Sequence, residues 1–432
     1  MADASTVTRA AVEAVWRIEA AQLIGGLVRY VRDLDCAEDL AQETLLAALE
    51  HWPERGVPDN PGAWLMTAAK RRAVDEARRR KMRAEKHLQL EQHAELALSA
   101  SQDADSEPSL GDDVLRLVFI ACHPVLSRDS RVALTLRWVA GLPTAAIARA
   151  FLTSEATMAQ RLVRAKRTLS EARVSFELPV GDELEARVAP TLEVVYLIFN
   201  EGYAATAGAD WVRSELCEEA MRLGRRLVGL LPNQAEVHGL LALMELQASR
   251  LRARVGADKE VVLLEDQDRM KWDRLLITRG LQGLERVEAL GRPLGPYALQ
   301  AAIAACHARA SSVAETDWPR IVALYDALVE LTGSPVVELN RAVAVAKAFG
   351  AEEALELVEE LADDARLRSY HWLPVVRASL LFELGRRSEA ELALETAIQL
   401  TTNDKERELL RARAAAYRES GLERTRADPG RP

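Results

Sequence analysis

Basic and amide side chains recur at helical spacing in "TSEATMAQRLVRAKRTL", the segment from Thr153 to Leu169. On a helix that turns about 100° per residue, these groups fall in one outward stripe. The stripe consists of Thr157, Gln160, Arg161, Arg164 and Arg167. Guanidinium, amide and hydroxyl groups bond to DNA phosphates and to base edges. The pattern therefore predicts a DNA-binding helix, and a solvated surface helix is the plain alternative.

The sequence around this stripe favours DNA binding. Ser154 is a suitable N-cap, and Glu155 puts an acid in the first turn, where the helix dipole favours it. Four apolar residues fall in one narrow sector away from the polar stripe: Met158, Leu162, Ala165 and Leu169. They predict the face that packs the helix down. Upstream, "GLPTAAIARAFLTS" predicts a short helix around 145–150 and a tight turn. Helix, turn and helix at this spacing form the two-part motif that reads DNA.

A second basic segment is "WLMTAAKRRAVDEARRRKMRAEK", from Trp64 to Lys86. Between Lys70 and Lys86 it has nine basic and three acidic residues. Such a helix neutralises several phosphates, so its affinity for DNA falls steeply with salt. The candidate DNA-binding residues are Trp64, Lys70, Arg71, Arg72, Arg78, Arg79 and Arg80. A charged surface helix is the alternative, and for Trp64 alone the alternative is a place in the core.

An acidic segment, "DCAEDLAQETLLAALEHW" from Asp35 to Trp52, precedes it. Four leucines are expected to pack: Leu40, Leu45, Leu46 and Leu49. Five other residues are expected to form a compact acidic patch: Asp35, Glu38, Asp39, Gln42 and Glu43. An acidic helix does not face DNA, but it suits a basic protein partner. A solvated face is again the alternative.

The net charge of −10 does not argue against DNA binding, because it is unevenly placed. Residues 1–175 carry 24 basic and 24 acidic side chains, and the rest of the chain carries 32 and 42. The acidic excess therefore belongs to the later residues. Hydrophobic residues make up 49% of the 432-residue chain and aromatic residues only 5%. This composition, rich in Ala, Leu, Glu and Arg, predicts an all-α protein of several domains.

Breaks in the pattern divide the chain into four parts. Prolines at 53, 58 and 61 mark a loop within the first part, 8–87. Residues 88–113 contain seven acidic and no basic residues, which predicts an acidic linker. A compact part follows at 114–175, and a helical array at 182–420. In that array Gly350 and Gly385 lie 35 residues apart in two similar helix–turn–helix stretches. A period near 34 is typical of tetratricopeptide (TPR) hairpins, so a TPR-like array is expected.

Catalytic chemistry is not expected. The sequence has no HExxH, no GxSxG and no phosphate-binding glycine-rich loop. Cys122 and His123 are adjacent but have no second pair of metal ligands, which favours a buried thiol beside a helix-end imidazole. The acids of "EDQDRMKWD" (Glu265, Asp266, Asp268 and Asp273) lack the spacing of a calcium loop and favour a salt-bridged segment. We therefore expect no catalytic residue, no metal and no cofactor.

The expected location is the cytoplasm. The four cysteines (Cys36, Cys122, Cys217 and Cys306) are far apart and read as reduced thiols. No apolar run approaches the roughly 18 residues that a membrane span needs. The first residues show no secretory signal pattern.

Three of these segments, in this order, resemble an extracytoplasmic-function (ECF) RNA polymerase sigma factor. "D-AEDLAQETLLAAL" is similar to the helix that binds the core polymerase, and "NPGAWLMTAAKRRAVDEARRR" to the segment that melts and reads the minus-10 element. "LPTAAIARAFLTSEATMAQRLVRAKRTL" is similar to the helix-turn-helix that reads the minus-35 element. The tail, with "LEVVYLIFNEGY" and "SPVVELNRAVAVA", resembles the subgroup with a C-terminal TPR-like extension. Lys70 stands where the family often has Asn, so its promoter preference does not carry over in detail.

The resemblance implies core RNA polymerase and promoter DNA as partners. The acidic helix would bind the polymerase, residues 64–80 the minus-10 element and the Thr157–Arg167 stripe the minus-35 element. The tail is expected to modulate activity through the sigma domains or a regulatory protein. The alternative is a helix-turn-helix regulator with a TPR sensor domain that acts without core polymerase. The acidic helix argues against it, because a repressor needs no polymerase-binding surface.

Overall fold

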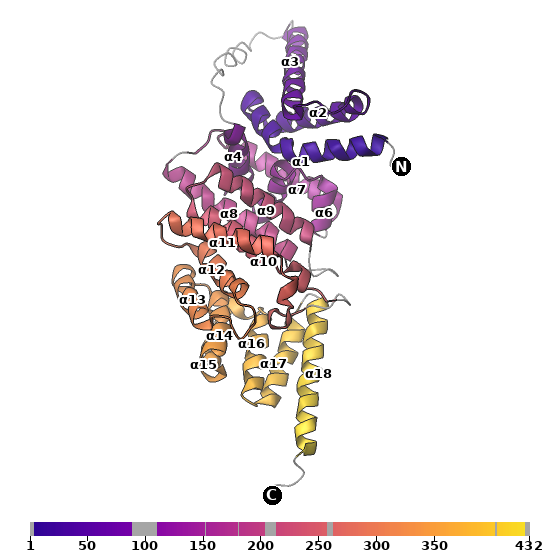
Figure 1. The fold of residues 1–432 in the computed structure, drawn as a ribbon. Helices are drawn as coiled ribbons and strands as arrows, with labels where there is room; N and C mark the ends of the chain where they lie inside the picture. Colours follow the sequence, from indigo (N-terminus) through magenta and orange to yellow (C-terminus); the bar gives the residue numbers. More distant parts are fainter. Residues whose placement is uncertain are drawn as a thin grey trace. The chain divides into compact units, whose positions relative to one another are not determined.

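The computed structural model describes residues 4–88, 110–151, 153–179, 181–203, 213–256, 262–401 and 404–427. The predicted linker, 88–113, lies almost entirely outside these residues. The regular elements of the described chain are helical, which confirms the predicted all-α fold (Figure 1). The chain divides into two compact units, Met1–Leu197 and Ile198–Pro432. We call them the N-terminal unit and the C-terminal unit.

The N-terminal unit contains α1 to α7 and the first part of α8. The bounds are α1 (Ala4–Val31), α2 (Leu34–Arg55), α3 (Pro61–Leu88), α4 (Leu110–Ala121), α5 (Arg128–Leu134), the π-helical turn η1 (Thr135–Val139), α6 (Thr144–Ala150), α7 (Glu155–Glu171) and α8 (Asp182–Tyr203). α2 begins where Asp33 accepts a hydrogen bond from the backbone N–H of Cys36 at 2.8 Å. α3 projects away from α1 and α2 (Figure 1).

Helix α1 lies at the centre of this unit and packs against α2, α3 and α4. Its Leu23 and Leu27 are almost fully buried. Gly25 lets α4 approach closely, because a β-carbon at this position would overlap the backbone carbonyl of Asp113. One turn further along α1, Arg29 forms an ion pair with Asp113 at 3.2 Å. The helices α3 and α4, on either side of residues 89–109, therefore both pack on α1.

The local structure predicted around α7 is confirmed. The Ser154 hydroxyl accepts a hydrogen bond from the backbone N–H of Thr157 at 3.1 Å. The four apolar residues of the expected stripe are buried: Met158, Leu162, Ala165 and Leu169. The short helix expected before the turn is α6. α7 thus has one face packed on the unit and one face outside.

The C-terminal unit is a succession of helices. Their bounds are α9 (Ser214–Leu230), α10 (Ala235–Ala248), η2 (Leu251–Ala253), η3 (Leu264–Asp266), η4 (Arg269–Lys271), α11 (Arg274–Ala289), α12 (Pro296–Arg309), α13 (Trp318–Thr332), α14 (Pro335–Ala348), α15 (Ala351–Leu361), η5 (Ala365–Leu367), α16 (Trp372–Glu383), α17 (Arg387–Leu400) and α18 (Asp404–Ala427). Gly350 and Gly385, both with positive φ, separate α14 from α15 and α16 from α17. The two expected helix–turn–helix stretches are therefore present, and their likeness to TPR hairpins stays a prediction.

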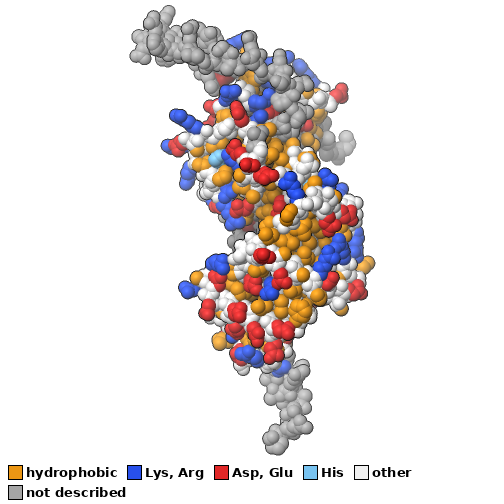
Figure 2. All heavy atoms as spheres, turned by 90° about the vertical axis from the view of Figure 1, so that its left-hand side faces the viewer, with side chains coloured by type: hydrophobic (Ala, Val, Ile, Leu, Met, Phe, Trp, Pro, Cys, Tyr) orange, Lys and Arg blue, Asp and Glu red, His pale blue; other side chains and the backbone are white. Residues whose placement is uncertain are grey.

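The core of the later helices is continuous. Buried residues from α12 to α18 form one cluster, which includes Leu299, Ile321, Leu339, Leu381 and Leu394. Because each helix pair buries its apolar face on the next pair, the array is stabilised by neighbour contacts. On the face shown in Figure 2, acidic side chains gather at the lower end of the C-terminal unit. This agrees with the acidic excess of residues 176–432.

The expectations for the cysteines and for the acidic segment before α11 are also confirmed. The four cysteines are free thiols, and Cys122 is buried at the end of α4 beside the half-buried His123. In the acidic segment before α11, Asp268 and Asp273 cap η4 and α11, and Glu265 pairs with Lys347 at 3.5 Å. Among the described helices, none is long and apolar enough to cross a membrane.

Candidate DNA and polymerase interfaces

The polar stripe of α7 faces outward. Thr157, Gln160, Arg164 and Arg167 are exposed, and the Arg161 side chain is 30% exposed. Two of the guanidinium groups form ion pairs at the surface: Arg161 pairs with Asp129 at 3.4 Å and Arg167 with Glu171 at 2.6 Å. Arg164 donates to the amide oxygen of Gln160 at 3.4 Å. Exposed pairs of this kind contribute little, so these groups can exchange their partners for phosphates.

The basic side chains of α3 also lie on the surface. Lys70, Arg71, Arg78 and Arg79 are exposed, and the side chain of Arg80 lies outside the described residues. The Lys70 ammonium group lies 5.9 Å from the centre of the Tyr30 ring, on α1. Arg72 is half-buried and donates to the carbonyl oxygen of Ala68 at 3.3 Å. α3 therefore offers a row of cations that begins at a cation–π contact with α1.

Trp64 lies at the base of this row. Its ring meets the ring of Trp52 edge to face, with 5.4 Å between the centroids. Trp52 is buried, whereas Trp64 is half-buried. Trp64 thus takes part in packing, and part of its ring remains accessible.

The acidic helix α2 differs from the expectation at two positions. Asp35, Asp39 and Glu43 are exposed, and Gln42 is half-buried. Glu38, expected in the same patch, is only 7% exposed. Leu46, expected to pack, is 60% exposed. The expectation was wrong at Glu38 because the side chain is covered by residues about one hundred positions later in the sequence.

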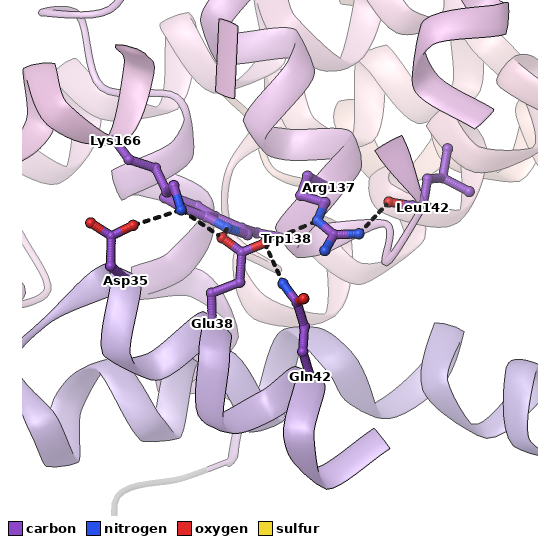
Figure 3. Close-up of polar contacts among 7 residues, drawn as sticks. All are labelled: Asp35, Glu38, Gln42, Arg137, Trp138, Leu142 and Lys166. Atoms are coloured by element: carbon purple, nitrogen blue, oxygen red, sulfur yellow. Dashed lines mark hydrogen bonds and ion pairs between the residues drawn. The ribbon is translucent and has the colours of Figure 1, made fainter. Parts of the chain in front are cut away.

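Glu38 is held by four side chains (Figure 3). Its Oε1 accepts from Arg137 Nε at 3.0 Å and from Gln42 Nε2 at 3.1 Å. Its Oε2 accepts from Trp138 Nε1 at 3.2 Å and from Lys166 Nζ at 3.3 Å. Lys166 also pairs with Asp35 at 2.6 Å. We call these six residues the Glu38 network: Asp35, Glu38, Gln42, Arg137, Trp138 and Lys166. It joins the acidic helix to the part of the chain that carries the helix-turn-helix.

The π-helical turn η1 positions two of the donors. Within it, Ala140 N–H donates to the carbonyl oxygen of Thr135, five residues back, at 3.1 Å. Arg137 Nη1 donates to the carbonyl oxygen of Leu142 at 3.4 Å, which fixes the guanidinium beside Glu38. Arg137, Trp138 and Lys166 were not predicted as site residues from the sequence. A signal existed for Lys166 alone, because it flanks the apolar stripe of α7 rather than the outward one.

Neighbouring charges favour the ionised forms of Glu38 and Lys166. Burial by itself would raise the pKa of Glu38, but Lys166 and Arg137 outweigh it and hold this pKa below its usual value. Burial would likewise lower the pKa of Lys166, but Asp35 and Glu38 outweigh it and raise this pKa. A buried carboxylate with two cations and two neutral donors has its hydrogen-bonding capacity filled. The Glu38 network is therefore a satisfied ionic contact within the N-terminal unit.

Three family models match the chain. Residues 17–83 match "Sigma-70 region 2", and residues 116–169 match "Sigma-70, region 4". Residues 187–288 match a "Family of unknown function (DUF6596)". The region 2 match contains α2 and most of α3, and the region 4 match contains η1, α6 and nearly all of α7.

The similar proteins point the same way. The chain is 30% identical over 171 residues to the ECF RNA polymerase sigma factor SigL of Mycobacterium tuberculosis, covering 38% of this chain and 90% of SigL. It is 28% identical over 164 residues to the probable ECF sigma factor SigI of that organism, covering 38% of this chain and 56% of SigI. It is 44% identical over 415 residues to an uncharacterized protein of Rhizobium meliloti, covering 94% of both chains. Fold and matches define a sigma-70-type protein. The chain belongs to the ECF sigma factors, and it carries a helical C-terminal extension.

Proposed function

We propose that this sigma factor binds core RNA polymerase through α2 and directs transcription initiation at promoters that α3 and α7 recognise. The observation that carries the proposal is the pairing of two exposed cationic surfaces, on α3 and α7, with an acidic helix in one unit. The cations suit promoter DNA, and the exposed acids of α2 suit a basic surface of the polymerase. The polymerase supplies the chemistry, so the sigma factor needs no catalytic residue. Because its proposed partners are core polymerase and promoter DNA, we place the protein in the cytoplasm.

In vitro transcription tests this proposal. Full-length protein is added to core polymerase with a library of promoter fragments, and start sites are mapped. Transcription from defined start sites that depends on the added protein supports the proposal. A protein that binds the fragments but recruits no core polymerase would instead be a helix-turn-helix regulator. Nothing in the fold or the matches favours that alternative.

The minus-10 and minus-35 assignments require the N-terminal unit to open. The two elements lie about 25 base pairs apart, or roughly 85 Å along straight DNA at 3.4 Å per base pair. The helix α2, which the Glu38 network joins to α7, has 22 residues and is therefore roughly 33 Å long. Two domains in direct contact across this helix do not span that distance. We therefore propose that promoter binding breaks the Glu38 network.

The same contact competes with the polymerase. Asp35 and Glu38 belong to the patch assigned to polymerase binding, and both carboxylates are bound to Lys166. Opening would expose Glu38 and free Asp35, and would release α7 to reach the upstream element. In this proposal the arrangement in the structure is a resting state, and loss of the Glu38 network accompanies assembly with the polymerase.

A reversible cross-link tests the resting state. The variant Asp35→Cys with Lys166→Cys, in a Cys36→Ser background, is joined by a thiol-cleavable bismaleimide and assayed for transcription. The cross-linked protein should be inactive and should recover when the linker is cleaved. Each single-cysteine variant, treated in the same way, should keep its own untreated activity. A cross-linked protein that initiates as well as the cleaved one would contradict the proposal.

The C-terminal unit is assigned a regulatory role. It is a helical array whose helices α12 to α18 share a continuous core, and extended arrays of this kind offer concave binding surfaces. We propose that it modulates initiation by contact with the sigma domains or with a regulatory protein.

A further inference from the structure

A cavity of about 470 Å³ lies inside the C-terminal unit. Its walls come from α14, α16 and α18, together with residues of α12 and α13 and the segment that contains η3 and η4. Small-molecule sites typically occupy 300–1,000 Å³ and are mostly apolar with a few convergent polar groups. The cavity has the size of such a site, and the family matches assign it no role.

One part of the wall is apolar and aromatic. It includes Val343 of α14, Val376 of α16, and the rings of Trp318, Tyr370 and Trp372. The ring of Trp318 is held edge to face by His307, with centroids 5.3 Å apart. Aromatic rings fixed in this way offer flat contact area at small entropic cost. This wall suits a flat, apolar body.

A second part of the wall carries two guanidinium groups without a carboxylate partner. Arg413 donates from Nε to the hydroxyl of Tyr417 and from Nη2 to the hydroxyl of Ser379, both at 3.1 Å. Arg269, 9% exposed, donates to the carbonyl oxygens of His307 and Ala310 at 2.8 and 2.7 Å. Within the described part of the chain, neither forms an ion pair. Both guanidinium groups therefore donate to neutral oxygens rather than to a carboxylate.

The other charged groups at the cavity do not neutralise them. Glu265 and Glu383 lie 3.5 and 3.9 Å from Lys347, and the three together carry a formal charge of −1, against +2 from Arg269 and Arg413. His307 is neutral at physiological pH, because burial, Arg250 and Arg269 lower its pKa to about 4. The cavity thus keeps a positive excess within the part of the chain that holds the whole acidic excess. Charge complementarity favours an anion here.

We propose that this cavity binds a small organic anion, with a flat apolar body against Trp318 and Trp372 and a carboxylate or sulfonate on Arg413. Arg413 has the geometry for this role, because its Nη1 donates to no described residue. Arg269 adds positive potential and fixes the segment before α11. Such a ligand would join α14, α16 and α18 through one molecule, and would act as an effector of the C-terminal unit. The proposal does not depend on the role of the sigma domains.

A pair of dyes tests both halves of the proposal on the full-length protein. Anilinonaphthalene sulfonate (ANS) is a flat aromatic anion, and N-phenylnaphthylamine has the same ring system without the sulfonate. The wild-type protein should bind ANS saturably and about tenfold or more tightly than the neutral dye, since a charge-assisted bond contributes about 1.5–3 kcal/mol. In Arg413→Gln this preference should disappear, while the neutral dye binds as before.

Two further variants complete the test. Arg418→Gln removes an exposed cation from the same helix, one that pairs with Glu391 at 3.9 Å outside the cavity, and should keep the preference. Val343→Trp fills the cavity and should abolish saturable binding of both dyes. Circular dichroism and thermal melting check that each variant is folded. Equal binding of the two dyes to the wild type, or an unchanged preference in Arg413→Gln, would overturn the proposal.

Discussion

Glu38 shows how a single carboxylate changes its role when distant residues cover it. On its own helix, Asp39 and Glu43 remain exposed, whereas Glu38 is surrounded by Arg137, Trp138 and Lys166. Removing a carboxylate from water costs several kcal/mol, and nearby cations offset this cost only while they stay in place. The contact is therefore stable when complete and weak when one member is lost. This makes it suitable for a contact that must break.

The variant Glu38→Gln should loosen the two sigma domains from each other. The amide keeps the shape but leaves Arg137 and Lys166 without their buried counter-charge, at a cost of about 3 kcal/mol. Hydrogen exchange should become faster in η1 and α7. Glu43→Gln, an exposed position on the same helix, is the matched control and should leave exchange unchanged. Equal protection in both variants would show that Glu38 does not hold the contact.

The same contact should be sensitive to acid. The pKa of Glu38 is lower in the folded protein than its usual value of 4.5. A lowered pKa means that the stabilising effect is complete above the usual value and is lost as the pH falls through the folded one. Protection of η1 and α7 should therefore be constant near neutral pH and fall below about pH 4.5. In Glu38→Gln this fall should be absent, and a fall of equal size would assign it to other groups.

On α7, Arg161→Ala together with Arg164→Ala should weaken binding to a minus-35 fragment. Loss of two phosphate or base contacts should cost about 1–3 kcal/mol each and reduce the dependence of affinity on salt. Fluorescence anisotropy at several salt concentrations measures both. Binding to core polymerase should persist, because neither residue belongs to α2. Loss of both activities would indicate misfolding and leave the assignment of the stripe unsupported.

At the scale of elements, N-caps and apolar stripes predicted those helices that contacts between sequence neighbours determine. The N-cap Ser154 and the buried stripe from Met158 to Leu169 follow from neighbours in sequence, so α7 could be predicted closely. The π-helical turn at 135–139 could not, because its Arg137 bonds to Glu38, which lies 99 residues away in the sequence. The burial of Glu38 could not be predicted for the same reason. Sequence periodicity reports which face of a helix is apolar, but it does not report which distant charge will cover a polar one.

The close approach of α1 and α4 gives a prediction about packing. Gly25→Ala would place a methyl group on the backbone carbonyl of Asp113, which cannot move away as a side chain can. The free energy of unfolding should fall by about 1–3 kcal/mol, typical of overpacking. Gly229→Ala in α9, where no side chain or neighbouring helix lies within 4 Å of the new methyl group, should be neutral or stabilising. Chemical denaturation of both variants measures the difference, and equal stabilities would contradict the packing of α4 on α1.

At the scale of the whole molecule, the uneven charge separates two tasks. The first 175 residues are neutral in sum and carry both cationic surfaces, whereas the remainder carries the charge of −10. An acidic C-terminal unit does not compete for DNA phosphates. Composition predicted this division, and it also predicted the helical class. It could not predict the cavity, because residues from Leu263 to Arg413 meet there only in three dimensions.

Removal of the C-terminal unit should change transcription. A chain that ends at Tyr203 keeps α8, whose Glu193 pairs with Arg128 and Arg131 of the N-terminal unit. Its output with core polymerase should differ from that of the full-length protein at equal concentration. A higher output would mean that the C-terminal unit restrains initiation, and a lower one that initiation needs it. An output equal to that of the full-length protein would contradict a modulating role.

If loss of the Glu38 network accompanies assembly with the polymerase, as proposed above, the network also sets the concentration of polymerase at which this protein becomes active. A sigma factor that must open before it binds shows an apparent dissociation constant equal to the intrinsic one divided by the open fraction. With an open fraction of about 1%, the apparent affinity for core polymerase would be about a hundredfold weaker. Sigma factors share one pool of polymerase. One buried glutamate would then decide this protein's rank in that competition, and any signal that favours the open state would raise it.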